Sequence, residues 1–225
     1  MSPARKNSPT GPHDRVVALL GPQHGATPDV GAALAELGIR GQVALVTAGY
    51  QEREPDDAAI VASLGVPAVN LKLHARATEV FAGDPEFAAA YRARQARLRH
   101  IQSFYRIRLD ATDDGARRIA VRHVDSKLLA QEEKVSVDQF RQLDVDHIER
   151  CAALRREFDD TWHSLARPLV ASHQAELRHA LEGCSALVIA GGHVASLLNR
   201  LVLFDVLELA RFKPCLLYTS PSPRD

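Results

Sequence analysis

The chain has 225 residues, of which 46% are hydrophobic and 25% are charged, and its formal net charge is zero. This length and composition are typical of one large globular domain, or of a domain that carries an insertion. Because a neutral chain has no overall field, we expect neither nucleic acid nor a membrane as its main partner. Three cysteines are too few for a disulfide framework, which favours a cytoplasmic protein.

The first part of the chain predicts alternating strands and helices behind a polar leader. Residues 1–13 contain three prolines and no apolar run, so they are expected to be a disordered leader rather than a secretion signal. Three strands are predicted, at residues 15–20, 42–47 and 68–73. Helices are expected between them, one from Pro28 to Leu37 and a short one that ends near Gly65. The β-α-β-α-β order indicates a parallel, doubly wound sheet.

Residues 84–181 are predicted to be an all-helical insertion in this α/β domain. Asp84-Pro85-Glu86 starts a first helix, and Thr112 to Gly115 is expected to end it. Further helices are expected at about 116–134, from about residue 144, and at 169–181. We expect the insertion to pack on one end of the sheet as a lid or a dimer surface, so a homodimer is one predicted assembly.

Six arginines make the first helix of the insertion strongly basic, with aromatic residues between them: Arg92, Arg94, Arg97, Arg99, Arg106 and Arg108. RNA or an acidic partner is one interpretation of this pattern. A solvated helix face is favoured instead, because the chain is neutral overall.

Two residue pairs in the insertion have the spacing of metal ligands. Glu176 and His179 follow the E-x-x-H pattern of di-iron helix bundles, and His147 and Cys151 are one helical turn apart. Surface histidines are the favoured interpretation, because paired spacing alone is weak evidence. No metal and no cofactor is therefore predicted.

A strand, a glycine turn and a helix follow the insertion. Residues 186–190 form a short apolar run, Gly191-Gly192 ends it, and an amphipathic helix comes next. This turn and the earlier turns at residues 21–24 and 48–51 are expected to converge at the carboxyl edge of the sheet, where open α/β folds bind ligands. The predicted substrate-binding residues are Gln23, His24, Gly49, Tyr50, Gln51 and His193.

The last eleven residues, 215–225, do not continue the preceding pattern. Their sequence, CLLYTSPSPRD, back-translates without a mismatch as the adapter of transposase-based sequencing libraries. We therefore expect the natural sequence to end near Lys213 or Pro214 and the chain to be an N-terminal fragment. The α/β domain then comprises residues 14–83 and 182–214 and lacks the strand that should come next.

Residues 43–54, VALVTAGYQERE, and 189–199, IAGGHVASLLN, resemble the class I glutamine amidotransferase-like superfamily. Within it the chain is similar to the serine-peptidase branch that contains cyanophycinase and aspartyl dipeptidase. The resemblance covers the strands and their order but not the helical insertion. It implies a flavodoxin-like three-layer α/β sandwich with a parallel sheet, and it assigns Gly191 and Gly192 to an oxyanion hole. The branch usually has a small or polar residue where this chain has His193.

The resemblance further implies a hydrolase that cleaves a small peptide or amide substrate through an acyl-enzyme. In that branch the serine nucleophile follows the next strand and the histidine base comes later. Both would lie beyond Pro214, so the chain itself is expected to be inactive. Two alternatives stay open: a non-catalytic ligand-binding or assembly protein, and a cysteine-dependent amidotransferase. The residue at the turn after the next strand distinguishes the three.

Overall fold

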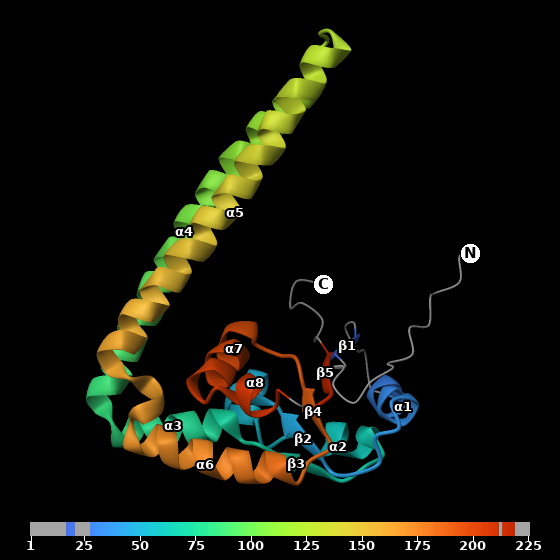
Figure 1. The fold of residues 1–225 in the computed structure, drawn as a ribbon, viewed down its shortest axis with the longest axis vertical. Helices are drawn as coiled ribbons and strands as arrows, with labels where there is room; N and C mark the ends of the chain where they lie inside the picture. Colours follow the sequence, from blue (N-terminus) through green and yellow to red (C-terminus); the bar gives the residue numbers. More distant parts are fainter. Residues whose placement is uncertain (1–16, 21–27, 212, 219–225) are drawn as a thin grey trace. The chain divides into compact units, whose positions relative to one another are not determined.

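The structure, a computed structural model, describes residues 17–20, 28–211 and 213–218 (Figure 1). The chain divides into two compact units. The sheet unit comprises Met1–Gly83 and Ser164–Asp225, and the hairpin unit comprises Asp84–His163. None of the helices in the described ranges combines the length and the apolar character that crossing a membrane requires.

The sheet unit is built on five parallel strands in the order β1-β5-β4-β2-β3. The strands are β1 (Val17–Leu20), β2 (Val43–Val46), β3 (Ala68–Asn70), β4 (Ala186–Ile189) and β5 (Cys215–Tyr218). Every residue of β2 and β4 is buried, which explains why both read as short continuous apolar runs. The predicted α/β class with a parallel sheet is confirmed.

Helices account for most of the remaining sheet unit: α1 (Pro28–Glu36), α2 (Ala58–Leu64), α3 (Leu73–Gly83), α6 (Pro168–Glu182), α7 (Val194–Leu203) and α8 (Val206–Leu209). Leu34 of α1 and Leu64 of α2 pack in one core cluster with Leu45 and Val188, so α1 and α2 cover one face of the sheet. Helices α3, α6, α7 and α8 contact one another as a second group. The predicted end of α2 is confirmed, because Gly65 adopts the left-handed conformation that terminates a helix.

Helix α3 was not predicted, and the strand expected at residues 68–73 ends at Asn70. Lys72 has a φ of 51°, which interrupts the extended backbone. The buried carboxylate of Glu54 then accepts hydrogen bonds from the backbone N–H groups of His74 and Ala75, both at 2.9 Å. The first turn of α3 is thus stabilised by a residue some twenty positions earlier, which no local pattern reveals.

The hairpin unit consists of two long antiparallel helices, α4 (Pro85–Ala120) and α5 (Ser126–Trp162). Asp84 and Asp125 cap them by accepting hydrogen bonds from first-turn N–H groups. The breaks predicted at Thr112–Gly115 and between residues 134 and 144 are wrong, because both segments are helical. A glycine costs an exposed helix only about 1 kcal/mol, and packing of α4 along α5 outweighs it.

An aromatic cluster lies where the two ends of this hairpin meet. The Phe87 ring lies 5.9 Å from that of Phe158 and 6.2 Å from that of Trp162. The Arg94 guanidinium lies between the rings of Tyr91 and Phe158, at 4.2 and 4.3 Å from their centroids, and Arg94 is only 7% exposed. The basic helix is therefore not a uniformly solvated face, since Arg94 packs inside the hairpin by cation–π contact.

The predicted boundaries of the insertion and the tail differ from these units. The predicted insertion spans residues 84–181, whereas the structure groups 84–163 together and α6 with the sheet unit. Residues 215–218, which we excluded from the fold as part of an adapter-derived tail, form β5 between β1 and β4. The expectation that β4 lacks a neighbour on this side is therefore wrong for this chain.

Candidate functional site

The turns after β2 and β4 lie side by side at the carboxyl edge of the sheet. The Ala190 N–H donates to the Val46 carbonyl at 2.8 Å, and the His193 N–H donates to the Gly49 carbonyl at 2.8 Å. Neighbouring parallel strands end at one edge, so the segments that follow them meet there. These two turns therefore converge at the sheet edge, as the sequence predicts. The third turn, with Gln23 and His24, lies outside the described residues.

Glycine is required where the two turns touch. A Cβ atom on Gly49 would lie 2.1 Å from the Gly191 carbonyl oxygen, and one on Gly192 would lie 2.6 Å from the Gly49 carbonyl. Gly192 also has a φ of 101°, which other residues rarely adopt. The glycines therefore let two backbone segments approach within van der Waals contact and fix the turn after β4 in place.

The turn after β4 presents backbone N–H groups at the start of α7. Within the part of the chain that the structure describes, the N–H groups of Gly191 and Gly192 make no hydrogen bond. His193 is the N-cap of α7, where its Nδ1 accepts from the Ser196 N–H at 3.1 Å. A helix N-terminus carries a partial positive charge, so donors and dipole together favour an anion or a developing oxyanion here.

Gln51 has a strained backbone beside this turn. Its φ of 57° and ψ of −124° fall in a region that glycine normally occupies. Such strain costs a non-glycine residue roughly 1–3 kcal/mol and tends to occur at functional sites. The Gln51 side chain donates from Nε2 to the Ser196 Oγ at 2.8 Å, which links the segment after β2 to α7.

A buried polar network that no sequence pattern predicts supports the segment after β2. Asn70 donates from Nδ2 to the Thr47 Oγ1 and to the Asp57 carboxylate, both at 2.8 Å. Thr47 is fully buried, and its hydroxyl donates to the Glu54 carbonyl at 3.2 Å. The one available signal was a threonine directly after a buried strand. Its partners come from separate loops and could not be identified by spacing.

The structure brings together Gly49, Gln51, Gly191, Gly192 and His193 among the predicted site residues. Tyr50, the sixth described one, packs against the core cluster beneath α1 and α2. The side chains of Gln51 and His193 are both engaged with Ser196 of α7. This edge of the sheet therefore offers mainly backbone N–H donors, which are held on a fixed turn.

Cys184 lies at the other end of β4. Burial raises the pKa of its thiol, although the nearby charge of Lys213 acts in the opposite direction. The thiol donates to the Ala180 carbonyl at 3.2 Å. A buried thiol with a raised pKa is a poor nucleophile, so Cys184 is a structural residue. Within the described ranges, no three histidine, cysteine, aspartate or glutamate residues are grouped as a metal ion would need.

Comparison of the chain with protein-family models, with curated proteins and with solved structures finds no match.

Proposed function

We propose that the turn after β4 is the oxyanion-binding part of an amide or peptide hydrolase that acts through an acyl-enzyme. The observation that carries this proposal is the pair of N–H groups at Gly191 and Gly192, without an acceptor in the described chain and held by contact with Gly49. In acyl transfer, preoriented backbone donors stabilise the negative charge that develops on the carbonyl oxygen. Removing one such donor typically lowers kcat by about 10²–10³.

In this proposal the nucleophile follows a strand that takes the place of residues 215–218 beside β4. The carboxyl end of that strand would fall at the same sheet edge as Gly191 and Gly192, because neighbouring strands of the sheet are parallel. A serine there would attack the carbonyl, and a histidine later in the protein would take its proton. The resemblance to the cyanophycinase and aspartyl dipeptidase branch, with its flavodoxin-like sandwich, supports this arrangement. The substrate class that fits is a small peptide or amide.

A second candidate is a non-catalytic ligand-binding or assembly protein on the same fold. The observation that favours it is the engagement of Gln51 and His193 with Ser196, which leaves backbone groups as the main donors at the edge. A cysteine at the nucleophile position would instead indicate an amidotransferase-type enzyme.

Reading the source gene onward from the Lys213 codon tests the proposal. We expect an apolar strand that replaces residues 215–218, then a small-Ser-small-Gly turn and a later histidine. A cysteine in that turn would indicate the amidotransferase. A strand without a nucleophile, or a stop codon, would contradict the enzyme and leave the binding protein.

An assay of this chain supplies the biochemical test. We expect no turnover of peptide or chromogenic amide substrates, because the proposed nucleophile and base are not among residues 1–214. Turnover that survives both His193→Ala and His24→Ala would contradict this arrangement of the site.

A further inference from the structure

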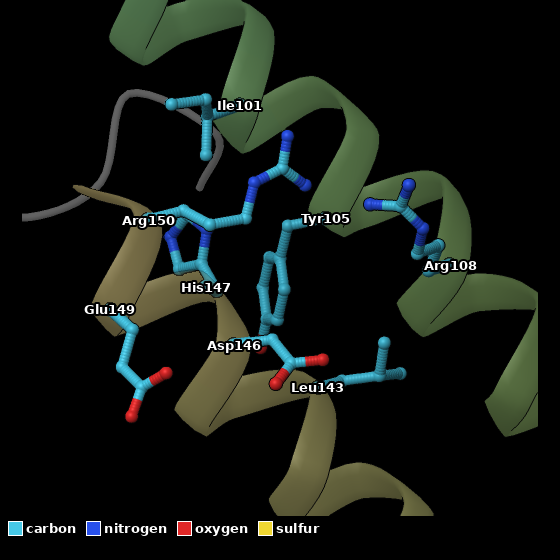
Figure 2. A pocket seen from close by; sticks show the side chains of 8 residues that line it. All are labelled: Ile101, Tyr105, Arg108, Leu143, Asp146, His147, Glu149 and Arg150. Carbon is cyan, nitrogen blue, oxygen red and sulfur yellow. The ribbon is translucent and has the colours of Figure 1, made fainter. Parts of the chain in front are cut away.

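A row of hollows runs along the hairpin unit between α4 and α5. The central hollow has a volume of about 350 Å³ and appears in Figure 2 with its lining residues: Ile101, Tyr105, Arg108, Leu143, Asp146, His147, Glu149 and Arg150. A second hollow of about 450 Å³ shares Arg108, Leu143 and Asp146 with it. A third, of about 240 Å³, lies nearer the base of the hairpin, beside Arg97 and Glu157.

The three hollows lie on one face of the hairpin. Their lining residues on α4 follow three- and four-residue steps: Ala90, Arg94, Arg97, Ile101, Arg108 and Ala111. Those on α5 do the same: Gln139, Leu143, Asp146, Arg150, Leu154 and Glu157. Residues at such spacing share one helix face. The hollows therefore form one groove, which we call the hairpin groove.

Phe104 stands at the edge of this groove. It lies three residues after Ile101 and four before Arg108, on the same face of α4, and it is 51% exposed. The central hollow is large enough for an aromatic ring, because a cavity of about 150 Å³ already accommodates benzene. The exposed Phe104 ring therefore lies on α4 at the level of the central hollow, which is lined by both helices.

The charges of the central hollow are balanced but unpaired. Arg108 and Arg150 flank the Tyr105 ring (Figure 2), and neither forms an ion pair within the described chain. Asp146 accepts only a hydrogen bond from Gln142, and Glu149 likewise has no ion pair within the described chain. Two cations and two anions in one surface make it complementary to itself.

The floor of the hollow is held in place. The Tyr105 hydroxyl donates to the Asp144 carboxylate at 2.6 Å, and its ring stacks on His147 with centroids 4.3 Å apart. A fixed floor reduces the entropy that ordering side chains would cost when a partner binds.

We propose that the hairpin groove binds the hairpin of a second copy of this chain, about a twofold axis that runs parallel to the two helices. That axis places α4 of one copy over α5 of the other, with Phe104 of each in the central hollow of its partner. Arg108 on α4 of each copy then meets Asp146 and Glu149 on α5 of the other. Such pairing is isologous, so one surface serves both subunits.

The charge of the two helices selects this axis. Helix α4 carries eight arginines against four acidic residues, whereas α5 carries nine acidic residues against six basic ones. A twofold axis across the hairpin would place α4 on α4 and α5 on α5 and set like charges together. The axis along the hairpin places the basic helix on the acidic one.

The face is also large enough for a stable dimer. A 36-residue helix is about 54 Å long, and two helices side by side are about 20 Å wide, so the face offers on the order of 1,000 Å². A standard interface buries about 800 Å² on each partner. The hairpin face alone is therefore large enough for a stable dimer, without any contribution from the sheet unit.

Sedimentation velocity of the full chain over a concentration series tests the proposal. We expect a monomer–dimer equilibrium that Phe104→Glu weakens at least about tenfold, as loss of a central aromatic anchor does. The matched control is Ile148→Glu, which adds the same charge at a 64% exposed apolar residue of the same hairpin. Ile148 lies two residues from both Asp146 and Arg150, hence on the opposite face of α5, and its variant should dimerise like the parent chain.

A pair of charge-exchange variants distinguishes a loss of dimerisation from a loss of folding. Arg108→Glu alone should weaken the dimer, because it sets a third carboxylate beside Asp146 and Glu149 of the other copy. Adding Asp146→Arg should restore it, while the helical circular dichroism stays the same in all variants. A monomer at every concentration, or equal losses from Phe104→Glu and Ile148→Glu, would overturn the proposal. Binding of an added amphipathic peptide in the groove of a strictly monomeric chain would assign the groove to another partner.

Discussion

At the level of single residues, the contact of Gly49 with Gly191 and Gly192 determines where the backbone donors point. Gly49→Ala forces a methyl group to within 2.1 Å of a carbonyl oxygen. Because this neighbour is backbone and cannot rotate away, we expect a loss of about 1–3 kcal/mol in the free energy of unfolding. Urea denaturation followed by circular dichroism measures it.

Gly183→Ala is the control for this substitution. The nearest atom to its new Cβ would be 3.8 Å away, and Gly183 has a φ of −75°. We expect its stability to stay within about 0.5 kcal/mol of the parent chain. Equal losses from both variants would mean that the two turns are not in close contact.

Asp205 gives a prediction about pH. Burial, and secondarily the charge of Glu208, raise the pKa of its carboxyl above the ordinary value of 3.8. The folded protein therefore binds this proton more tightly than the unfolded chain, and stability is lost as the pH rises through the folded-state pKa. Asp205→Asn removes this loss, and asparagine tolerates the left-handed backbone at φ 51°.

We expect Asp205→Asn to raise the Tm at neutral pH and to have little effect below pH 3.8, where both states are largely protonated. Thermal melts at the two pH values measure this difference. Glu208→Gln should give a smaller gain, because it removes only the lesser cause and also breaks the ion pair of Glu208 with Arg211. A Tm gain of the same size at both pH values would contradict the assignment.

At the level of elements, helix α3 depends on the carboxylate of Glu54. Glu54→Gln keeps the size of the side chain but turns an amide N–H toward one of the two helical donors. We expect a loss on the order of 2 kcal/mol in the free energy of unfolding, since hydrogen bonds to charged groups are worth about that much. Glu52→Gln, at an exposed position two residues away, is the control. A matching loss in both variants would show that the capping of α3 contributes little.

The elements that the sequence predicts are those with local signals. Strands β2 and β4 are short apolar runs bounded by turn residues, and α6 begins with Pro168 at its first position. Helix α3 was missed because its cap comes from Glu54, and two breaks were placed in α4 and α5 because packing between the helices outweighs weak helix formers. Tertiary contacts, not propensity, decide these segments.

The candidate site is likewise predictable only where its signals are local in the sequence. Glycine turns at the ends of apolar strands predicted that Gly49, Gly191 and Gly192 would meet at one sheet edge. The strained backbone of Gln51 and the hydrogen bonds from Asn70 to Thr47 and Asp57 depend on side chains far apart in sequence. A single sequence carries no signal for such pairs.

At the level of the whole molecule, β5 completes the sheet between β1 and β4. Leu216 of β5 is 1% exposed and belongs to the core cluster, so Leu216→Asp places a charge in an apolar interior. We expect a loss of several kcal/mol in the free energy of unfolding, measured by urea denaturation. Leu207→Asp, at a 42% exposed position, should cost far less. An unchanged stability in Leu216→Asp would mean that residues 215–218 do not contribute a strand.

The hairpin also bears on the order in which the chain folds. Val43 pairs with Ala186 in the centre of the sheet, across most of the chain, and closing so long a loop is slow. Helices α4 and α5 are joined by a short turn, and their far ends meet where Phe87 contacts Phe158. Once the hairpin forms, it replaces some eighty flexible residues by a short connection and lowers the entropy cost of pairing β2 with β4. The single tryptophan, Trp162, lies in that aromatic cluster, so in refolding experiments its fluorescence should recover before the sheet excludes solvent.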